Sequence, residues 1–222
     1  MVGHFQEFED EYLETMYEFH EVEPLGIVRT GDLAARLRVS PASATEMVQR
    51  LASRGLLEYI PYKGARLTDE GLVHGQKMKR RHRLAEVLLE HLPYEGNAHE
   101  TACRLEHAID DDMEVALSRL VGADALDPSG RPIPPPTEDI ETRLKGSGRT
   151  VSLLEMQDGE SGHLVGMLLP VDAKEGLDAA GCTLGSHLSK SGEHLLTSAG
   201  DVLSISDDWL RAVFISVEEN ST

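Results

Sequence analysis

The sequence predicts a mainly α-helical protein with small β elements, ending in a small β-barrel. Three observations predict this fold. Apolar residues recur at helical spacing through much of the first 121 residues. A turn signal at Lys63 and Gly64 separates two short strand-like segments. Residues 149–218 contain strand-like runs with glycine turns between them, and the 222 residues allow two or three small domains.

The N-terminal segment predicts three helices joined by short turns. The first covers residues 5–21, where aromatic and apolar residues recur at helical spacing. The second covers residues 31–37, with Thr30 as the expected N-cap. After a tight turn, Ser40 is expected to cap the third helix, and Gly55 to end it.

A two-stranded wing is expected after the third helix. Residues 56–68 read L-L-E-Y-I-P-Y-K-G-A-R-L-T, with strand-like residues on both sides of the Lys63–Gly64 turn. Helix, helix, turn, helix and wing in this order are typical of a winged helix-turn-helix. In that fold the second helix of the helix-turn-helix pair enters the major groove of DNA.

Two long helices are expected downstream. The first runs from about Thr68, its expected cap, to His91. The second covers about residues 95–121, which carry a sustained apolar stripe. We expect these helices to form a dimerisation and ligand-binding domain.

The helical pattern stops at Gly122. The stretch from there to Gly148 is rich in proline, which predicts a linker or an extended arm. The expected organisation has four parts: a winged helix-turn-helix at 1–72, a helical metal-binding and dimerisation domain at 73–135, a linker at 136–148 and the β-barrel at 149–222.

Charge is unevenly distributed along the chain. The formal net charge is −18, which by itself argues against nucleic acid because phosphates repel an acidic surface. Residues 29–83, however, carry 12 Lys or Arg and 5 Asp or Glu, a net charge of +7. A basic segment in an acidic chain indicates a local contact with double-stranded DNA.

The candidate DNA contacts come from the helix-turn-helix and the wing. Short hydroxyl side chains near the start of the third helix suit phosphates or base edges, small methyl groups suit thymine, and cationic side chains suit phosphates. The residues are Arg29, Thr30, Ser40, Ala42, Ser43, Thr45, Gln49, Arg50, Lys63 and Arg66.

The strongest chemical signal is the run A-H-E-T-A-C-R-L-E-H at residues 98–107. It places His99, Cys103, Glu106 and His107 at helical spacing on one face. Imidazole and carboxylate suit Fe(II) and Mn(II), and a thiolate favours softer ions. The alternative is a polar stretch on a solvated helix face.

Other titratable residues give weaker signals. His82 and Glu86 form an i, i+4 pair after K-M-K-R-R, so a salt-bridged or phosphate-facing role competes with metal binding. Glu11 and Glu14, beside an aromatic stripe, are most simply interpreted as a solvated acidic face.

Two other functions remain open on the residues alone. H-E-T-A-C resembles the zinc-protease pattern H-E-x-x-H, but Cys103 occupies the second histidine position, and no nucleophile elbow or phosphate loop is present. We therefore expect no enzyme, with a zinc hydrolase as the least favoured alternative. A metal-independent or thiol-redox regulator, in which oxidation of Cys103 is the signal, is the second hypothesis.

Compartment is inferred from what the chain lacks. No apolar run approaches the roughly 18–20 residues that span a bilayer. The polar, acidic N-terminus shows no secretory signal. We expect a cytoplasmic protein with no membrane partner, in which Cys103 and Cys182 serve as thiols or metal ligands.

Several motifs, in order, closely resemble the diphtheria-toxin-repressor family of iron- or manganese-dependent transcriptional repressors. They are V-R-T-G-D-L-A-A-R-L-R-V-S-P-A-S-A-T-E-M-V-Q-R-L-A-S-R-G-L, Y-K-G-A-R-L-T-D-E-G, R-R-H-R-L-A-E, H-E-T-A-C-R-L-E-H and R-P-I-P. The resemblance covers about residues 5–135, and residues 149–218 resemble more weakly the family's SH3-like (FeoA-like) third domain. It implies a homodimer that binds operator DNA, with Fe(II) or Mn(II) as co-repressor and two ions per subunit.

The resemblance also implies a ligand set. Glu11, Cys103, Glu106 and His107 match the regulatory site, and His82, Glu86 and His99 match the ancillary site. Asp172 and Glu175 lie where some relatives add ligands from the third domain. The chain departs from both types. Glu11 stands where the iron type has methionine, and Cys103 stands where the manganese type has a carboxylate.

Overall fold

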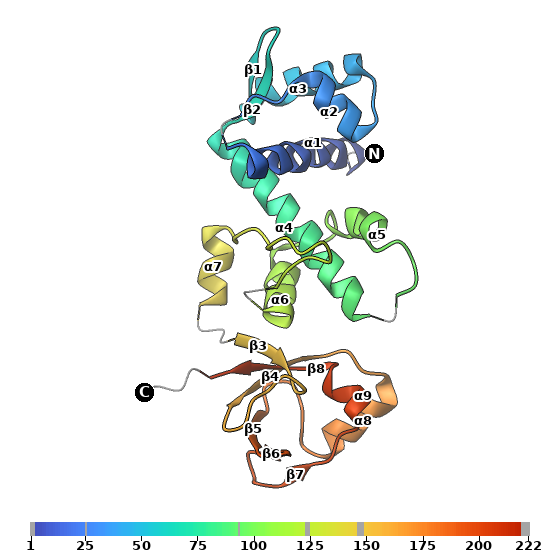
Figure 1. The fold of residues 1–222 in the computed structure, drawn as a ribbon, viewed down its shortest axis with the longest axis vertical. Coiled ribbons are helices and arrows are strands. Elements are labelled where there is room, and N and C mark those ends of the chain that lie inside the picture. Colours follow the sequence, from blue (N-terminus) through green and yellow to red (C-terminus); the bar gives the residue numbers. More distant parts are fainter. Residues whose placement is uncertain (1–2, 25, 93, 123–124, 146–148, 219–222) are drawn as a thin grey trace. The chain divides into compact units, whose positions relative to one another are not determined.

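The structure is a computed structural model that describes residues 3–24, 26–92, 94–122, 125–145 and 149–218 (Figure 1). The chain forms two compact units. The first comprises Met1–Arg83, Glu100–Ile109 and Ile133–Glu138. The second comprises Leu84–His99, Asp110–Pro132 and Asp139–Thr222. In the described part of the chain, no helix is long and apolar enough to cross a membrane.

The first unit begins with the predicted winged helix-turn-helix. Its elements are α1 (Gly3–Val22), α2 (Thr30–Leu37), α3 (Pro41–Ser53), β1 (Leu57–Ile60) and β2 (Gly64–Leu67). The two strands pair antiparallel as the wing (Figure 1). The predicted order of elements is confirmed.

Local signals set the ends of these helices. The Ser40 hydroxyl accepts a hydrogen bond from the Ser43 backbone N–H at 3.1 Å, so it caps α3 as predicted. The expected cap of α2 was wrong: Arg29 is the N-cap residue, without a side-chain hydrogen bond, and Thr30 is already helical.

A single apolar cluster holds α1, α2, α3 and the wing together. Burial of this surface supplies most of the favourable free energy of packing. Its fully buried members are Tyr12, Leu13, Met16, Leu33, Ala34, Ala44, Val48, Leu51, Leu56, Leu57 and Ala65.

Helix α4 (Asp69–His91) starts as the sequence predicts, because the Thr68 hydroxyl accepts a hydrogen bond from the Gly71 N–H at 3.1 Å. Gly75 lies where α4 crosses α1. A Cβ atom at this position would be 2.4 Å from the Leu13 carbonyl oxygen, so only glycine allows the two helices to approach this closely.

The single helix expected over residues 95–121 is wrong. The structure has α5 (Ala98–Leu105) and α6 (Asp111–Val121), with an interruption at 106–110. Asp110 causes the restart, because its carboxylate accepts a hydrogen bond from the Met113 N–H at 2.8 Å and caps α6.

The segment predicted as a linker contains a helix. Helix α7 (Glu138–Leu144) lies within residues 136–148, and its Ile140 is 1 % exposed. Burial of one apolar side chain supports a short helix that is too brief to show a helical period. The predicted domain boundaries themselves stay a prediction.

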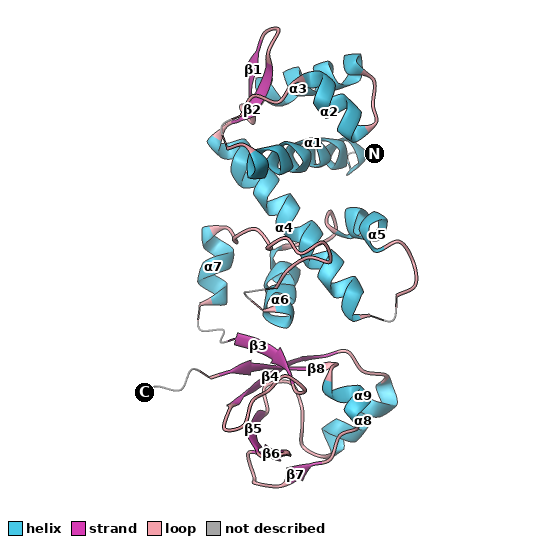
Figure 2. Ribbon diagram, viewed as in Figure 1, coloured by secondary structure: helices cyan, strands magenta, loops and turns pink. Residues whose placement is uncertain are grey.

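The C-terminal part is a six-stranded antiparallel sheet in the order β3-β8-β4-β5-β6-β7 (Figure 2). Its elements are β3 (Arg149–Ser152), β4 (Ser161–Met167), α8 (Val171–Ala179), β5 (His187–Ser191), β6 (His194–Thr197), β7 (Val202–Leu203), α9 (Asp207–Leu210) and β8 (Val213–Val217). Its core is apolar and includes Leu164, Leu188 and Ile215. The predicted small β domain is therefore present.

Candidate metal centre and DNA-binding surface

Three buried side chains meet in the first unit. Glu14 comes from α1, His82 from α4 and Glu106 from the turn after α5, and their exposed fractions are 7 %, 1 % and 1 %. One potential ligand atom from each lies within 4.8 Å of the others. The close crossing at Gly75 brings α1 near enough to α4 for Glu14 to reach this cluster.

The cluster combines two carboxylates with one imidazole. His82 Nδ1 lies 2.6 Å from Glu106 Oε2 and 3.7 Å from Glu14 Oε1. Burial raises the pKa of Glu106 to about 7, although the hydrogen bond from His82 acts in the opposite direction. The nearby positive groups of the protein therefore do not fully offset the cost of burying the negative charge of Glu106.

A buried lysine continues the cluster towards the helix-turn-helix. Lys79 Nζ, 1 % exposed, donates a hydrogen bond to Glu14 Oε1 at 3.0 Å and a second to Glu18. Glu18 in turn accepts a 2.6 Å hydrogen bond from Arg36 on α2. A continuous line of charged contacts thus joins the cluster to the helix that precedes α3.

Cys103 and His107, both predicted ligands, lie around the cluster. Cys103 Sγ and a ring nitrogen of His82 are within 4.8 Å of each other. His107 Nε2 lies 3.5 Å from Glu106 Oε1, and its Nδ1 lies 3.5 Å from Asp10 Oδ2. This Nδ1 is buried, and its interaction with the Asp10 carboxylate raises the pKa of His107. His82, assigned to the second site by resemblance, thus lies beside Cys103 and Glu106, assigned to the first.

The burial of Glu11 and Glu14 on α1 is the reverse of what the predictions require. Glu11, predicted as a ligand, is exposed. Partial burial of its carboxylate and the neighbouring Glu14 raise its pKa, while His107 opposes the shift. Glu14, which the sequence suggested was solvated, is buried, so that interpretation was wrong. The missed signal is the i, i+4 spacing of Asp10, Glu14 and Glu18, which lines one face of α1 with carboxylates.

Four further predicted ligands belong to the second unit: Glu86, His99, Asp172 and Glu175. There, His99 Nδ1 lies 2.9 Å from Glu86 Oε1. Asp172 and Glu175 are exposed on α8, and within the described part of the chain neither forms a hydrogen bond or ion pair. The second metal site stays a prediction.

The donor set around Glu106 fits a divalent first-row ion. Two carboxylates and the His82 imidazole are in reach of one another, the Cys103 thiol is in reach of the same imidazole, and Fe(II) and Mn(II) accept such ligands. The raised pKa of the buried Glu106 indicates that a positive charge would be favourable here.

Helix α3 presents the predicted recognition residues in different ways. Ala42, Ser43 and Gln49 are exposed. The Thr45 hydroxyl donates to the Pro41 carbonyl at 2.8 Å, and the Ser40 hydroxyl caps the helix. These two hydroxyls are therefore partly committed to the helix itself.

Much of the predicted positive charge is already paired. Arg50 lies 2.9 Å from Glu9, and Arg66 lies 2.6 Å from Glu58. Arg29 and Lys63 are exposed, and the described residues include no ion-pair partner for either. Of the predicted phosphate contacts, these two cations need no rearrangement before meeting DNA.

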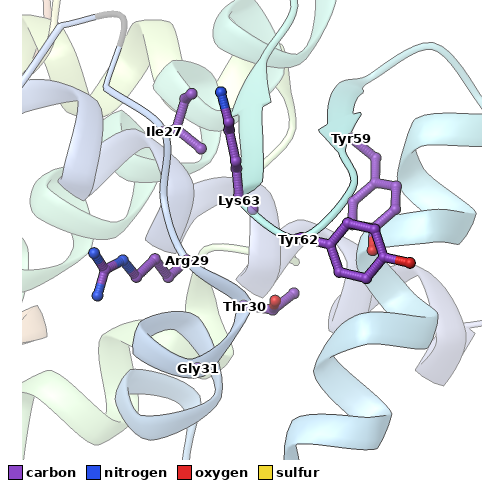
Figure 3. A pocket seen from close by; sticks show the side chains of 8 residues that line it. Ile27, Arg29, Thr30, Gly31, Tyr59, Tyr62 and Lys63 are labelled. Carbon is purple, nitrogen blue, oxygen red and sulfur yellow. The ribbon is translucent and has the colours of Figure 1, made fainter.

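Arg29 and Lys63 line a pocket of about 560 Å³ between the wing and the start of α2 (Figure 3). Tyr62, at the wing tip beside them, is fully exposed and has φ +62°. The Lys63 N–H donates to the Ile60 carbonyl at 3.0 Å, which closes a turn where glycine is usual at the third position. Tyr62 therefore holds an exposed aromatic side chain, on a strained backbone, beside the two cations, and it was not among the predicted DNA contacts.

Comparison with known proteins agrees with these features. Residues 4–65 match the family "Iron dependent repressor, N-terminal DNA binding domain", and residues 68–135 match "Iron dependent repressor, metal binding and dimerisation domain". An iron-dependent repressor IdeR of Mycobacterium leprae is 31 % identical over 163 residues, covering 71 % of this chain and 68 % of that protein.

Two further relatives extend the match. The diphtheria toxin repressor of Corynebacterium efficiens is 30 % identical over 217 residues, covering 91 % of this chain and 92 % of that protein. The solved structure of T. acidophilum IdeR has a TM-score of 0.49 at 23 % identity and covers 95 % of this chain and 97 % of that one. The extent of the sequence matches shows that this chain belongs to the diphtheria toxin repressor family of iron-dependent repressors.

Proposed function

We propose that this chain is a metal-dependent, DNA-binding transcriptional repressor that acts as a homodimer on operator DNA, with Fe(II) or Mn(II) as co-repressor. One observation carries the proposal: the buried Glu14–His82–Glu106 cluster lies in the same compact unit as the winged helix. The family matches and the iron-dependent relatives support both halves of the proposal.

Glu14, His82 and Glu106 form the centre of the proposed regulatory site, with Cys103 and His107 beside them. Glu11, one turn from Glu14, is the further carboxylate expected from the sequence. A bound divalent cation supplies positive charge that the buried carboxylates share. A second ion is proposed at Glu86 and His99, with Asp172 and Glu175 as additional ligands. The resemblance implies His82 for this second ion, but His82 Nδ1 faces Glu106, so we propose His82 for the regulatory site.

The residues of this chain suggest how the site influences DNA binding. Glu14 holds α1 against α4 through Lys79, and Glu18 links Lys79 to Arg36 on α2. A cation bound at Glu14 would therefore change the strength of the contacts that hold α1 against α4 and α2. By linkage, DNA must favour the metal-loaded form by the same free energy, roughly 1–3 kcal/mol.

The proposed DNA surface combines α3 with the wing. Ala42 and Gln49 are available for the major groove, with Ser43 beside them in a hydrogen bond to the Ser40 hydroxyl, and Arg29 and Lys63 are available for phosphates. Tyr62 extends this surface at the wing tip (Figure 3). In a dimer, two such surfaces meet two operator half-sites.

The donor types do not single out one metal. Cys103 favours iron and the carboxylates favour manganese. We propose that the protein controls genes of metal homeostasis, acts in the cytoplasm and has no catalytic activity.

The test measures binding to the chain's own promoter DNA under anaerobic conditions, with chelator and then with Fe(II) or Mn(II). Native protein should bind only with metal, and Glu106→Gln should lose this response. Glu23→Gln, the same change at an exposed position directly after α1, is the matched control and should behave as native. Metal-independent binding by both variants would refute the co-repressor role.

The same assay separates the redox alternative. If oxidation of Cys103 were the signal, peroxide would change DNA binding of metal-free native protein and would not affect Cys103→Ser. We expect no peroxide response without metal, and Cys103→Ser is expected to weaken the metal response.

A further inference from the structure

Three titratable side chains converge on one face of the C-terminal sheet. In the antiparallel register, His163 on β4 pairs directly with His187 on β5 and, on its other side, with Ser216 on β8. Glu218 follows Ser216 by two residues and therefore lies on the same face. Its N–H donates to the Ser161 carbonyl at 2.8 Å, which keeps this end of β8 beside β4.

The Glu218 carboxylate lies between the two imidazoles, with one oxygen facing each ring. His163 Nε2 lies 3.3 Å from Glu218 Oε1, and His187 Nε2 lies 3.5 Å from Glu218 Oε2. The two imidazole rings are 5.2 Å apart between centroids, at 72°. A single ion would draw the three side chains closer together, because neighbouring ligand atoms in a tetrahedral site with bonds of about 2.0–2.1 Å are about 3.4 Å apart.

The hydrogen bonding of His163 indicates which ring nitrogen can bind a cation. Its Nδ1 lies 3.1 Å from the Gly185 carbonyl oxygen, which can only accept a hydrogen bond. Nδ1 therefore donates, and in the neutral ring the lone pair is on Nε2, facing the Glu218 carboxylate. Two acceptors that face each other need a proton or a cation between them. Histidine ligands of metals typically show this bond from the other ring nitrogen to a carbonyl.

Access from solvent is open. His163, His187 and Glu218 are each partly exposed, so an ion can enter and water can complete its coordination. All three lie in the second unit, in a different compact unit from Glu14 and Glu106.

We propose that His163, His187 and Glu218 form a further metal site, on the C-terminal sheet, for a divalent first-row transition ion that accepts imidazole. Zn(II) and Co(II) are suitable probes because both take nitrogen and carboxylate ligands in tetrahedral geometry. The bound ion joins β4, β5 and the end of β8. This site stands independently of the proposed repressor function.

The experiment counts ions bound by the full chain at equilibrium with Zn(II), and records the visible spectrum with Co(II). His187→Ala is expected to bind one ion fewer per chain than native protein and to lose one component of the Co(II) spectrum. His194→Ala, an exposed histidine at the start of β6, is the matched control and should retain the native count.

A second variant distinguishes the loss of a metal ligand from misfolding of the protein. Glu218→Gln keeps the shape of the side chain and removes its charge, and it is expected to lose the same ion while keeping the native circular dichroism spectrum. Native ion counts in both His187→Ala and Glu218→Gln would overturn the proposal. Loss of the Glu106-dependent DNA response would leave this result unaffected, so the two proposals fail separately.

Discussion

The charged cluster of the first unit and the core of the C-terminal sheet are built from different chemistry. Around the cluster, Lys79, His82, Arg83 and Glu106 are each 1 % exposed. The sheet encloses Leu153, Met156, Leu164, Leu188 and Val213, which are equally buried. The cluster depends on the balance of buried charge, whereas the core of the sheet depends on apolar packing.

Because of this difference, the stability of the charged cluster depends on whether protons or a metal ion are bound. A buried charge is costly unless an opposite charge accompanies it, so a change of proton or metal occupancy alters the free energy of that interior. Apolar burial responds little to either. A regulator can therefore place its sensor in one unit without destabilising the other.

The largest expected effect is that of Lys79→Met. This change leaves Glu14 and Glu18 close together without their ammonium partner, so the metal-free protein should lose about 3–5 kcal/mol of unfolding free energy. Divalent metal should restore part of this loss because it supplies positive charge. Urea denaturation with chelator and with metal measures both effects, and Lys145→Met, at an exposed position, should change neither. Equal loss with and without metal would contradict the comparison.

An apolar deletion in the sheet should behave differently. Leu164→Ala is expected to cost about 3 kcal/mol, from lost burial and the cavity left behind. Because no charge is involved, the loss should be the same with chelator and with metal. Denaturation followed by circular dichroism tests this, and rescue by metal would show that the interiors are not independent.

A smaller effect is expected from pH. Burial raises the pKa of Glu106 to about 7 from an ordinary value of 4.5, so between these values the folded protein binds more protons at this group than the unfolded chain does. This group's contribution to stability should therefore fall as pH rises from about 4.5 to about 7. Denaturation of metal-free native protein across this window should show the decline, and Glu106→Gln should lack it. An identical slope in both proteins would refute the assignment.

The smallest effect on stability concerns the wing. Tyr62→Gly should raise the unfolding free energy by about 1 kcal/mol, because glycine adopts the left-handed conformation without the penalty of a side chain. The same change should weaken DNA binding several-fold. Tyr62→Phe keeps the ring and the strain and should retain native stability. Unchanged DNA affinity in Tyr62→Gly would leave the strained turn without a functional role.

Local signals explain which elements the sequence predicted correctly. Ser40 and Thr68 cap α3 and α4, and the wing turn follows from Lys63 and Gly64. Prediction of α5 and α6 failed because a continuous apolar stripe was given more weight than the cap at Asp110.

The sequence by itself determined the order of elements in the winged helix-turn-helix, the family and the candidate ligands Cys103, Glu106 and His107, because caps, turns and motif spacing act over a few residues. Only the tertiary structure decided that several arginines of the basic segment are paired, that Glu14 is buried beside His82, and that Lys79 bridges Glu14 and Glu18. The contacts of Glu14 and Lys79 depend on how closely α1 approaches α4 at Gly75, and such an approach between distant segments leaves no local periodic signal in the chain.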